Sequence, residues 1–368
     1  MTSSQGIRLL GIGKAVPEHS ISQQDAVVLA QQLCVMDKQA SRQVPILYAR
    51  SKIDRRGSVL LERNGTDTMP TTSFYAQGQH AEDLGPDTEA RMRRYAAEAP
   101  WLAVEAAQGA LAQARVAKES IRHLVTVSCT GFEAPGFDLA LIRKCGLSPE
   151  VSRTHIGFMG CHGVFNALRT AKALAQADAS HVLICSVELC SLHFAYKSGP
   201  DAWVPNALFA DGAAAAVIGP VQKEKTPRLW TLEASGSMLF PDSADVMTWR
   251  IGNHGFEMTL SPQVPALIQT FLRPWVETWL GRQGLRLQDV RSWAIHPGGP
   301  RILDAVHTSL TLPDTMTAAS RQVLADHGNM SSATILFILD MLVKSGAATP
   351  CVALGFGPGL TVEAALWL

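Results

Sequence analysis

The chain has 368 residues, of which 47% are hydrophobic and 17% are charged, and 32 basic and 32 acidic side chains give a formal net charge of zero. This length and hydrophobic content are sufficient to bury a large core in two domains or in one large duplicated domain. A neutral chain has no overall field that would hold nucleic acid or an acidic membrane surface, so we expect neither as a partner.

The N-terminal segment and the hydropathy of the chain give no indication of a membrane. The opening residues MTSSQGIRLLGIGKAVPEH have no basic stretch followed by an apolar one, as a secretion signal has. No window contains the roughly 18 uncharged apolar residues that a membrane-spanning helix requires. We therefore expect a cytoplasmic enzyme without integral membrane association.

Seven cysteines are scattered through apolar segments, with no Cys-x-x-Cys pair and no closely spaced set of Cys and His ligands. The spacing predicts no metal site. An odd number of cysteines in a chain without a secretion signal favours reduced thiols, most of them small core residues.

The first half alternates predicted helices and strands in chain order. Residues 63–94 are rich in turn-forming and polar residues and predict an irregular surface excursion. Apolar periodicity then predicts a helix, a strand, a helix and a strand, at residues 100–117, 123–129, 163–174 and 182–187. In residues 207–218, the pair Asp211-Gly212 predicts a tight turn between two short strands.

The second half repeats this order. It predicts a helix, a strand, a helix and a strand, at residues 264–280, 293–296, 330–343 and 351–354, followed by a turn within residues 355–363 and a last strand at 364–368. Alternating helices and apolar strands predict parallel sheets that are covered on both faces. The repetition indicates an internal duplication with a boundary near residues 223–227.

Cys161 stands between Gly160 and Gly163 at the start of a predicted helix. Unpaired N–H groups and the positive end of the helix dipole stabilise a thiolate there, so we expect the pKa of this thiol to fall from roughly 8.5 toward neutrality. The glycines would allow a bulky thioester to approach. The alternative is a buried structural cysteine at a site of close helix packing.

Two polar residues of the second half, His296 and Asn329, stand at the ends of predicted elements, as Cys161 does in the first half. His296 ends a predicted strand, where parallel sheets place their active sites, and Asn329 opens the predicted helix that corresponds to the one opened by Cys161. Two facing helix starts would aim a thiolate and a carboxamide at one substrate carbonyl. The alternatives are a core histidine and an Asn N-cap. His162 is a weaker candidate, because adjacent helical residues point in different directions.

The motifs HPGGP (296–300), GNMSSA (328–333), GFGPGLTVE (355–363) and ALFADGAAA (207–215), together with the glycine-flanked cysteine, resemble type III polyketide synthases, the chalcone and stilbene synthase family. The resemblance covers nearly the whole chain. It implies an α/β thiolase-like αβαβα layered fold from two duplicated halves. The N-terminal half, residues 1–225, would carry the nucleophilic cysteine, and the C-terminal half, residues 226–368, the catalytic histidine and asparagine. It also implies a homodimer.

The resemblance further implies the reaction of an acyltransferase. Cys161 would take an acyl starter from acyl-CoA, while His296 and Asn329 would hold the malonyl-CoA thioester during decarboxylation. Repeated condensation would yield a pyrone, a resorcinol or another aromatic polyketide. The CoA thioesters are substrates, and no cofactor is implied. The alternatives are a single-condensation enzyme like 3-oxoacyl synthase III acting on acyl carrier protein, and a scaffold protein that has lost the chemistry.

The family pattern also assigns residues to the substrate cavity. Phe209 matches the gatekeeper phenylalanine and Phe256 a second aromatic beside it, and further cavity positions fall on Cys129, Cys190, His193, Met247 and Ser331. Plant chalcone synthases have threonines where this chain has Cys190 and His193, and a glycine at Met247. These differences predict a product other than chalcone. The segment MTWRIGNHGFEM (247–258) resembles the bacterial branch of the family, in which the starter chain could run into an apolar tunnel.

The basic residues near the predicted tunnel entrance match the family less closely. Arg50 aligns with a residue that contacts CoA, whereas Lys52, Arg55 and Arg56 are interpreted as a solvated charge run. Arg91, Arg93 and Arg94 are interpreted as an exposed helix face.

Overall fold

The computed structural model describes residues 6–63, 69–220 and 230–368, which form two large β-sheets separated and covered by helices. The domain boundary that we expect near residues 223–227 lies outside the described residues, so the division at residue 225 stays a prediction.

The first sheet has five strands in the order β1-β7-β6-β4-β5. Their bounds are Ile7–Ala15, Asp211–Pro220, His181–Leu189, Ile121–Ser128 and Ser152–Gly157. Strand β7 pairs antiparallel with β1 and β6, whereas β4 pairs parallel with β6 and β5.

The second sheet has the order β11-β12-β13-β8, with bounds Ser292–Ile295, Cys351–Gly357, Thr361–Trp367 and Leu232–Leu239. Only β11 and β12 are parallel. The expectation of parallel sheets was therefore only partly right, because the three-residue turn Pro358–Leu360 reverses the chain between β12 and β13. A parallel connection would need a crossover of about a dozen residues.

The two sheets repeat one topology. The series β4-β6-β7-β1 and the series β11-β12-β13-β8 have the same order and the same succession of one parallel and two antiparallel pairs. This repetition confirms the predicted duplication.

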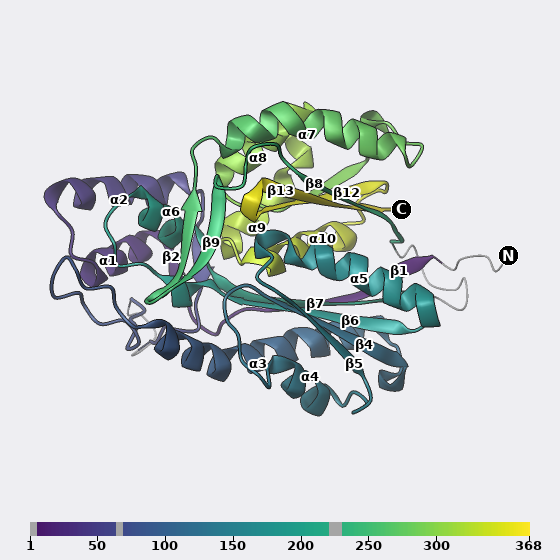
Figure 1. The fold of residues 1–368 in the computed structure, drawn as a ribbon, viewed down its shortest axis with the longest axis horizontal. Coiled ribbons are helices and arrows are strands. Elements are labelled where there is room, and N and C mark those ends of the chain that lie inside the picture. The colour runs from purple at the N-terminus through teal and green to yellow at the C-terminus, as the bar shows by residue number, and fades with distance from the viewer. Residues whose placement is uncertain (1–5, 64–68, 221–229) are drawn as a thin grey trace.

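Helices form three layers around these sheets (Figure 1). Helices α3 (Thr88–Ala114) and α4 (Phe137–Cys145) cover the outer face of the first sheet, and α7 (Val264–Gly281) and α8 (Pro300–Leu310) cover the outer face of the second. Helices α5 (Gly163–Asp178) and α10 (Thr334–Lys344) lie between the sheets and share one core with both, beside α9 (Ala318–His327). The result is the predicted αβαβα arrangement.

Smaller elements gather at one end of the layers (Figure 1). They are α1 (Gln23–Leu33), α2 (Lys38–Arg50), α6 (Pro200–Leu208), the strand pair β2 (Ser20–Ser22) and β3 (Arg55–Gly57), and the hairpin of β9 (Met247–Gly252) and β10 (Gly255–Leu260). Their side chains enclose the cavity described below.

Three local predictions were wrong in their bounds. Helix α3 begins at Thr88 and contains Pro100, where a helix start was predicted; the Asp87 side chain caps it by accepting from the Ala90 N–H at 2.8 Å. Asp211-Gly212 is not a turn, because strand β7 runs unbroken from Asp211. The last turn takes only Pro358–Leu360, so β12 and β13 are longer than predicted.

Strand β7 shows why a turn dipeptide misled the sequence reading. The strand is buried on both faces, and its alanines pack against helices on either side. The Asp211 carboxylate accepts from the Val59 N–H at 2.9 Å and from the Ser191 N–H at 2.7 Å. Partners distant in sequence thus hold an aspartate inside a strand.

Over the described residues, no helix has both the length and the apolar character needed to cross a membrane.

Candidate active site

Cys161 lies in the short turn η2 (Gly160–His162), which leads directly into α5. Gly160 has φ +76°, and a Cβ there would overlap Cδ of Pro358, so the glycine lets the GFGPG turn of the second half contact the cysteine turn. The Gly160 N–H donates to Sγ of Cys129 at 2.9 Å. The cysteine is thus held at the contact between the two halves.

Asn329 precedes the corresponding turn η6 (Ser331–Ala333) before α10. Its backbone pairs with the Phe209 segment: Asn329 N–H donates to Leu208 O and Ala210 N–H donates to Asn329 O, both at 2.9 Å. Its Oδ1 accepts from the Ser331 N–H at 2.9 Å. Turn η6 packs against the turn that carries Cys161, and the Ser331 and Asn329 side chains act to lower the pKa of the Cys161 thiol. The two predicted helix starts therefore meet.

His296 follows β11, and its backbone N–H donates to Leu354 O in β12 at 2.8 Å. Strand β12 in turn contacts the turn that carries Cys161. The side chain is 1% exposed, and neither ring nitrogen has a hydrogen-bond partner within the described residues. A buried imidazole whose two nitrogens lack hydrogen-bond partners lowers the stability of the fold. Such a residue indicates a functional group that forms its hydrogen bonds with a bound ligand.

Burial sets the protonation of both candidate groups. It raises the pKa of the Cys161 thiol to about 12, against the smaller opposing effect of the hydrogen bond from Ser331. It lowers the pKa of His296 to about 3, with a further decrease from the nearby His162. The sequence expectation of a lowered thiol pKa was therefore wrong for the free protein, because desolvation outweighs the helix start.

His162 has a structural environment of its own. Its Nδ1 lies 3.1 Å from Oδ1 of Asn166, whose Nδ2 donates to Glu363 at 3.3 Å, and Arg169 pairs with Glu363 at 2.7 Å. A Cβ at Gly357 would overlap the His162 ring. These contacts tie α5 to β13 and agree with the low weight that the sequence gave to His162 as a catalytic group.

Two cavities meet at Cys161. The larger, of about 430 Å³, extends from Cys161 between β10, α6 and α1, and the smaller, of about 30 Å³, reaches Asn329, Leu208 and Gly298. Residues common to both linings are Cys161, Pro205, Phe209, Met247 and Met258. Phe209 and Met247 therefore belong to the wall between the cavities, beside the thiol.

Comparison with known proteins gives this site its context. Residues 2–221 match the N-terminal domain of chalcone and stilbene synthases, and residues 231–367 match their C-terminal domain. The chain belongs to the chalcone and stilbene synthase family. An alpha-pyrone synthesis polyketide synthase-like protein of Mycobacterium tuberculosis is 32% identical over 364 residues, which are 97% of this chain and 90% of the relative.

Solved structures give the same result. A polyketide synthase, PKS-I, of the brown alga Ectocarpus siliculosus superposes with a TM-score of 0.92 at 28% identity over 99% of this chain and 98% of that one. The C-terminal type III polyketide synthase domain of Steely1 from Dictyostelium superposes with a TM-score of 0.88 at 28% identity, over 98% and 99%. The chain is thus a type III polyketide synthase and an acyltransferase, which confirms the predicted family, fold and reaction class over the single-condensation alternative.

Most of the predicted cavity residues lie together in the structure. The larger cavity is lined by Cys129, Cys161, Cys190, His193, Phe209, Met247, Phe256 and Ser331, and the smaller one by Asn329. His296 and Arg50 line neither cavity, and Arg50 is exposed at the end of α2. The roles of all these residues stay predictions.

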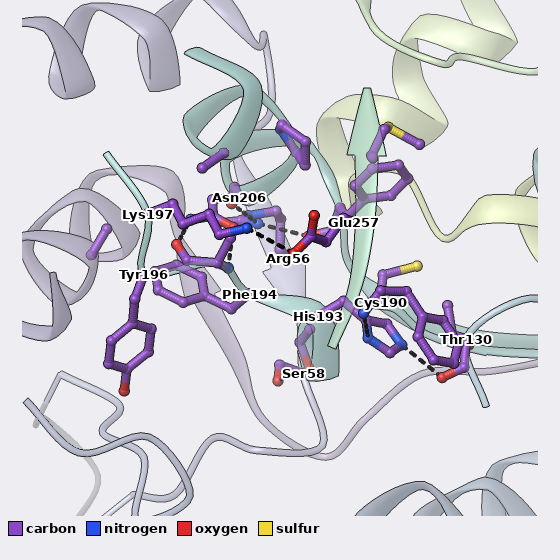
Figure 2. A pocket seen from close by; sticks show the side chains of 18 of the residues that line it. Arg56, Ser58, Thr130, Cys190, His193, Phe194, Tyr196, Lys197, Asn206 and Glu257 are labelled. Atoms are coloured by element: carbon purple, nitrogen blue, oxygen red, sulfur yellow. Dashed lines mark hydrogen bonds and ion pairs between the residues drawn. The ribbon is translucent and has the colours of Figure 1, made fainter. Parts of the chain in front are cut away.

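The ring nitrogens of His193 are hydrogen-bonded inside the protein and are not available to the cavity. Its Nε2–H donates to Thr130 O at 2.7 Å, its Nδ1 accepts from the Phe256 N–H at 2.9 Å, and its ring stacks on Phe256 at 4.2 Å. Figure 2 shows the ring turned toward Thr130. Both nitrogens are occupied, so His193 fixes Phe256 and presents only ring carbons to the cavity.

Of the arginines that the sequence assigns to the surface, Arg91 is internal and Arg56 is half-buried. Arg91 is fully buried and donates to Pro86 O at 2.8 Å and to Phe194 O at 3.0 Å. It also lies against Gly255, where a Cβ would be 3.0 Å from its Nη1. It also donates to Leu192 O at 2.5 Å, so it holds the chain on either side of His193. Arg56 lines the larger cavity instead of belonging to a solvated charge run.

Sequence reasoning also missed Glu188 and Trp249. Glu188 is a buried acid in an apolar strand, and that anomaly was a usable signal. Trp249 donates from Nε1 to Cys129 O at 2.8 Å and meets the His193 ring edge-on at 5.4 Å. Nothing in the sequence alone distinguished this tryptophan from ordinary core residues.

The buried His193 predicts acid sensitivity. Burial lowers its pKa to about 3, while a histidine in the unfolded chain titrates near 6.5, so only the unfolded state takes up this proton as the pH falls below about 6.5. Stability is therefore lost toward acid pH. In His193→Gln, the decrease in unfolding free energy between pH 7 and pH 5 should be smaller by about 2 kcal/mol. Urea unfolding at both pH values measures this difference; an equal decrease in both proteins would contradict it.

Proposed function

We propose that the synthase loads an acyl starter from acyl-CoA onto Cys161, extends it iteratively with malonyl-CoA and releases a pyrone, a resorcinol or another aromatic polyketide. The observation that carries the proposal is a thiol at the junction of two cavities, whose linings also include Ser331 and Asn329. The unpartnered imidazole of His296 supports it.

Loading requires a thiolate that the free protein does not favour. Since burial keeps both Cys161 and His296 neutral, we propose that the Cys161 proton passes to His296 as the starter thioester arrives. Attraction within the resulting ion pair and the hydrogen bonds from Ser331 and Asn329 would stabilise the thiolate. Attack on the thioester carbonyl forms the Cys161 thioester, and CoA leaves as its thiol with the proton from His296.

The extension step would use His296 and Asn329, both from the second half of the chain. His296 and Asn329 would donate to the malonyl thioester oxygen, where negative charge collects when the bond to the carboxylate breaks and CO₂ leaves. The resulting enolate carbon attacks the Cys161 thioester and displaces the thiolate. No cofactor is needed, because the departing CO₂ leaves its electron pair on the carbon that forms the new bond.

The cavity linings indicate the class of starter. Aliphatic residues of α1 line the larger cavity, namely Ala26, Leu29, Ala30 and Leu33. An apolar acyl chain fits such a wall better than a polar one. We propose that Phe209 and Phe256 exclude water from the carboxylate and that Met247 limits the room for ring closure. The Mycobacterium tuberculosis relative, whose name assigns it to alpha-pyrone synthesis, supports a pyrone product.

A homodimer in the cytoplasm, where CoA thioesters are available, completes the proposal. Strand β5 is the edge of the first sheet, and its residues Ser152 to His155 are exposed. Phe132 and Met159, each 40% exposed, lie in the loops that follow β4 and β5. An uncovered edge beside large apolar side chains favours pairing with a second copy.

Cys161→Ala tests the function itself. Wild-type protein with malonyl-CoA and a panel of acyl-CoA starters should yield products of several condensations by mass spectrometry. The variant should yield none while it keeps its unfolding midpoint, because alanine is close in size to cysteine. A single condensation confined to acyl carrier protein would favour the alternative enzyme, and undiminished product from the variant would rule out the mechanism.

Asn329→Ala tests the decarboxylation step. Loss of one oxyanion donor should slow malonyl-CoA decarboxylation by roughly 10²-fold. Release of CO₂ from labelled malonyl-CoA measures the rate, and acylation of Cys161 by the starter, followed by mass spectrometry, controls for an intact site. An unchanged rate would remove Asn329 from the mechanism.

Sedimentation velocity tests the dimer. Wild-type protein should sediment at twice the chain mass of 39.6 kDa, and Phe132→Glu should shift it toward monomer by placing a charge in the contact. Leu239→Glu, at a more exposed apolar residue of the second sheet, is the matched control. A monomeric wild-type protein, or equal effects of both variants, would contradict the proposed surface.

A further inference from the structure

We propose that Arg56 is a positioning residue that holds the Phe209 segment and the Asn329 segment together and so sets the place of the Asn329 carboxamide; this inference rests on the proposed function. Arg56 lies in β3, outside every motif that the sequence singled out.

Three of the five N–H donors of the Arg56 guanidinium bond to the protein itself. Its Nη1 donates to Phe209 O at 2.6 Å and to Asn206 O at 2.8 Å, and its Nε donates to Oε1 of Gln23 at 3.0 Å. The opposite side faces the Tyr48 ring at 5.7 Å. Figure 2 shows the side chain directed toward the Asn206 segment at the cavity wall.

Arg56 lacks the partner that an internal arginine usually has. Within the described residues, it forms no ion pair, and three of its donors go to neutral oxygens. A half-buried charge is costly unless its donors are well satisfied. Because the donors reach Gln23 in α1, Asn206 in α6 and Phe209 just after α6, the arrangement fixes the relative position of these segments.

The same side chain also contacts the segment that carries Asn329. A Cβ at Gly328 would lie 3.0 Å from Cγ of Arg56, so Gly328 allows the arginine stem to pack against its backbone. Phe209 and Asn329 pair as a parallel bridge, with hydrogen bonds on both sides at 2.9 Å. Arg56 thus holds one strand of the bridge through its guanidinium and packs on the other through its stem.

The functional consequence follows from this bridge. Asn329 is the proposed oxyanion donor, and Phe209 stands in the wall beside Cys161. A displacement of about 1 Å at a reacting group can cost roughly 10²-fold in rate. Loss of the Arg56 contacts should therefore lower the rate of decarboxylation without removing any group that touches the substrate. Lysine cannot replace arginine here, because a single ammonium does not reproduce the planar fork.

The experiment uses the full-length protein with Arg56→Lys, Arg56→Gln and a matched control, Arg55→Gln. Arg55 is the exposed neighbour in β3, and within the part of the chain that the structure describes its side chain donates only to Ser20 Oγ, at 3.1 Å. Both Arg56 variants should lower kcat for malonyl-CoA decarboxylation about 10-fold, with KM and the rate of Cys161 acylation changed by less than about threefold. Arg55→Gln should match the wild type. If Arg56→Gln does not fold, Arg56→Lys carries the test, since it keeps the charge and the apolar stem.

A double variant separates positioning from a general structural role. In the Asn329→Ala background, Arg56→Lys should slow decarboxylation by less than about twofold more, because the group it positions is already gone. Multiplicative losses, or wild-type kcat in folded Arg56→Lys, would overturn the inference. A normal rate in Asn329→Ala alone would instead refute the proposed role of Asn329, so the two failures are distinguishable.

Discussion

The site depends on one buried carboxylate, that of Glu188 at the end of β6. Its Oε2 accepts from the Cys129 N–H at 3.0 Å and from Oγ of Thr130 at 2.8 Å, both in the first half, and its Oε1 accepts from Oγ of Ser332 in the second half. A buried acid held by donors from both halves ties the start of η6 to the loop after β4. Burial is the main cause of the raised pKa of the Cys161 thiol, and the nearby Glu188 raises it further.

Phe209 and Phe256, which we propose exclude water from the carboxylate, are also held in place by arginines. Arg56 donates to the Phe209 carbonyl, and Arg91 anchors the chain around His193, whose ring stacks on Phe256. Backbone carbonyls satisfy a guanidinium without adding a mobile partner side chain. Rigid cavity walls keep the hydrogen-bond donors of the site in place while the cavity admits acyl chains.

The sequence predicted the layered fold well because its strongest signals are local. Apolar periodicity located α7 to within one residue and gave the start of α5, although α5 ends four residues beyond the predicted end; each helix buries one continuous face. It failed where tertiary contacts override a local preference. Pro100 lies inside α3 because the helix packs against β1 and β7, and Asp211 lies in a strand because Ser191 and Val59 supply its partners.

The sequence by itself determined the family, the duplicated halves and the identity of Cys161, His296 and Asn329 as candidates, because these are carried by contiguous motifs. Only the tertiary structure decided how those groups are protonated and what holds them. Desolvation depends on everything that surrounds a side chain, so a helix start could not reveal that the Cys161 thiol has a raised pKa. In the same way, Arg56 and Arg91 donate to carbonyl groups more than a hundred residues away in the sequence, which no local pattern records.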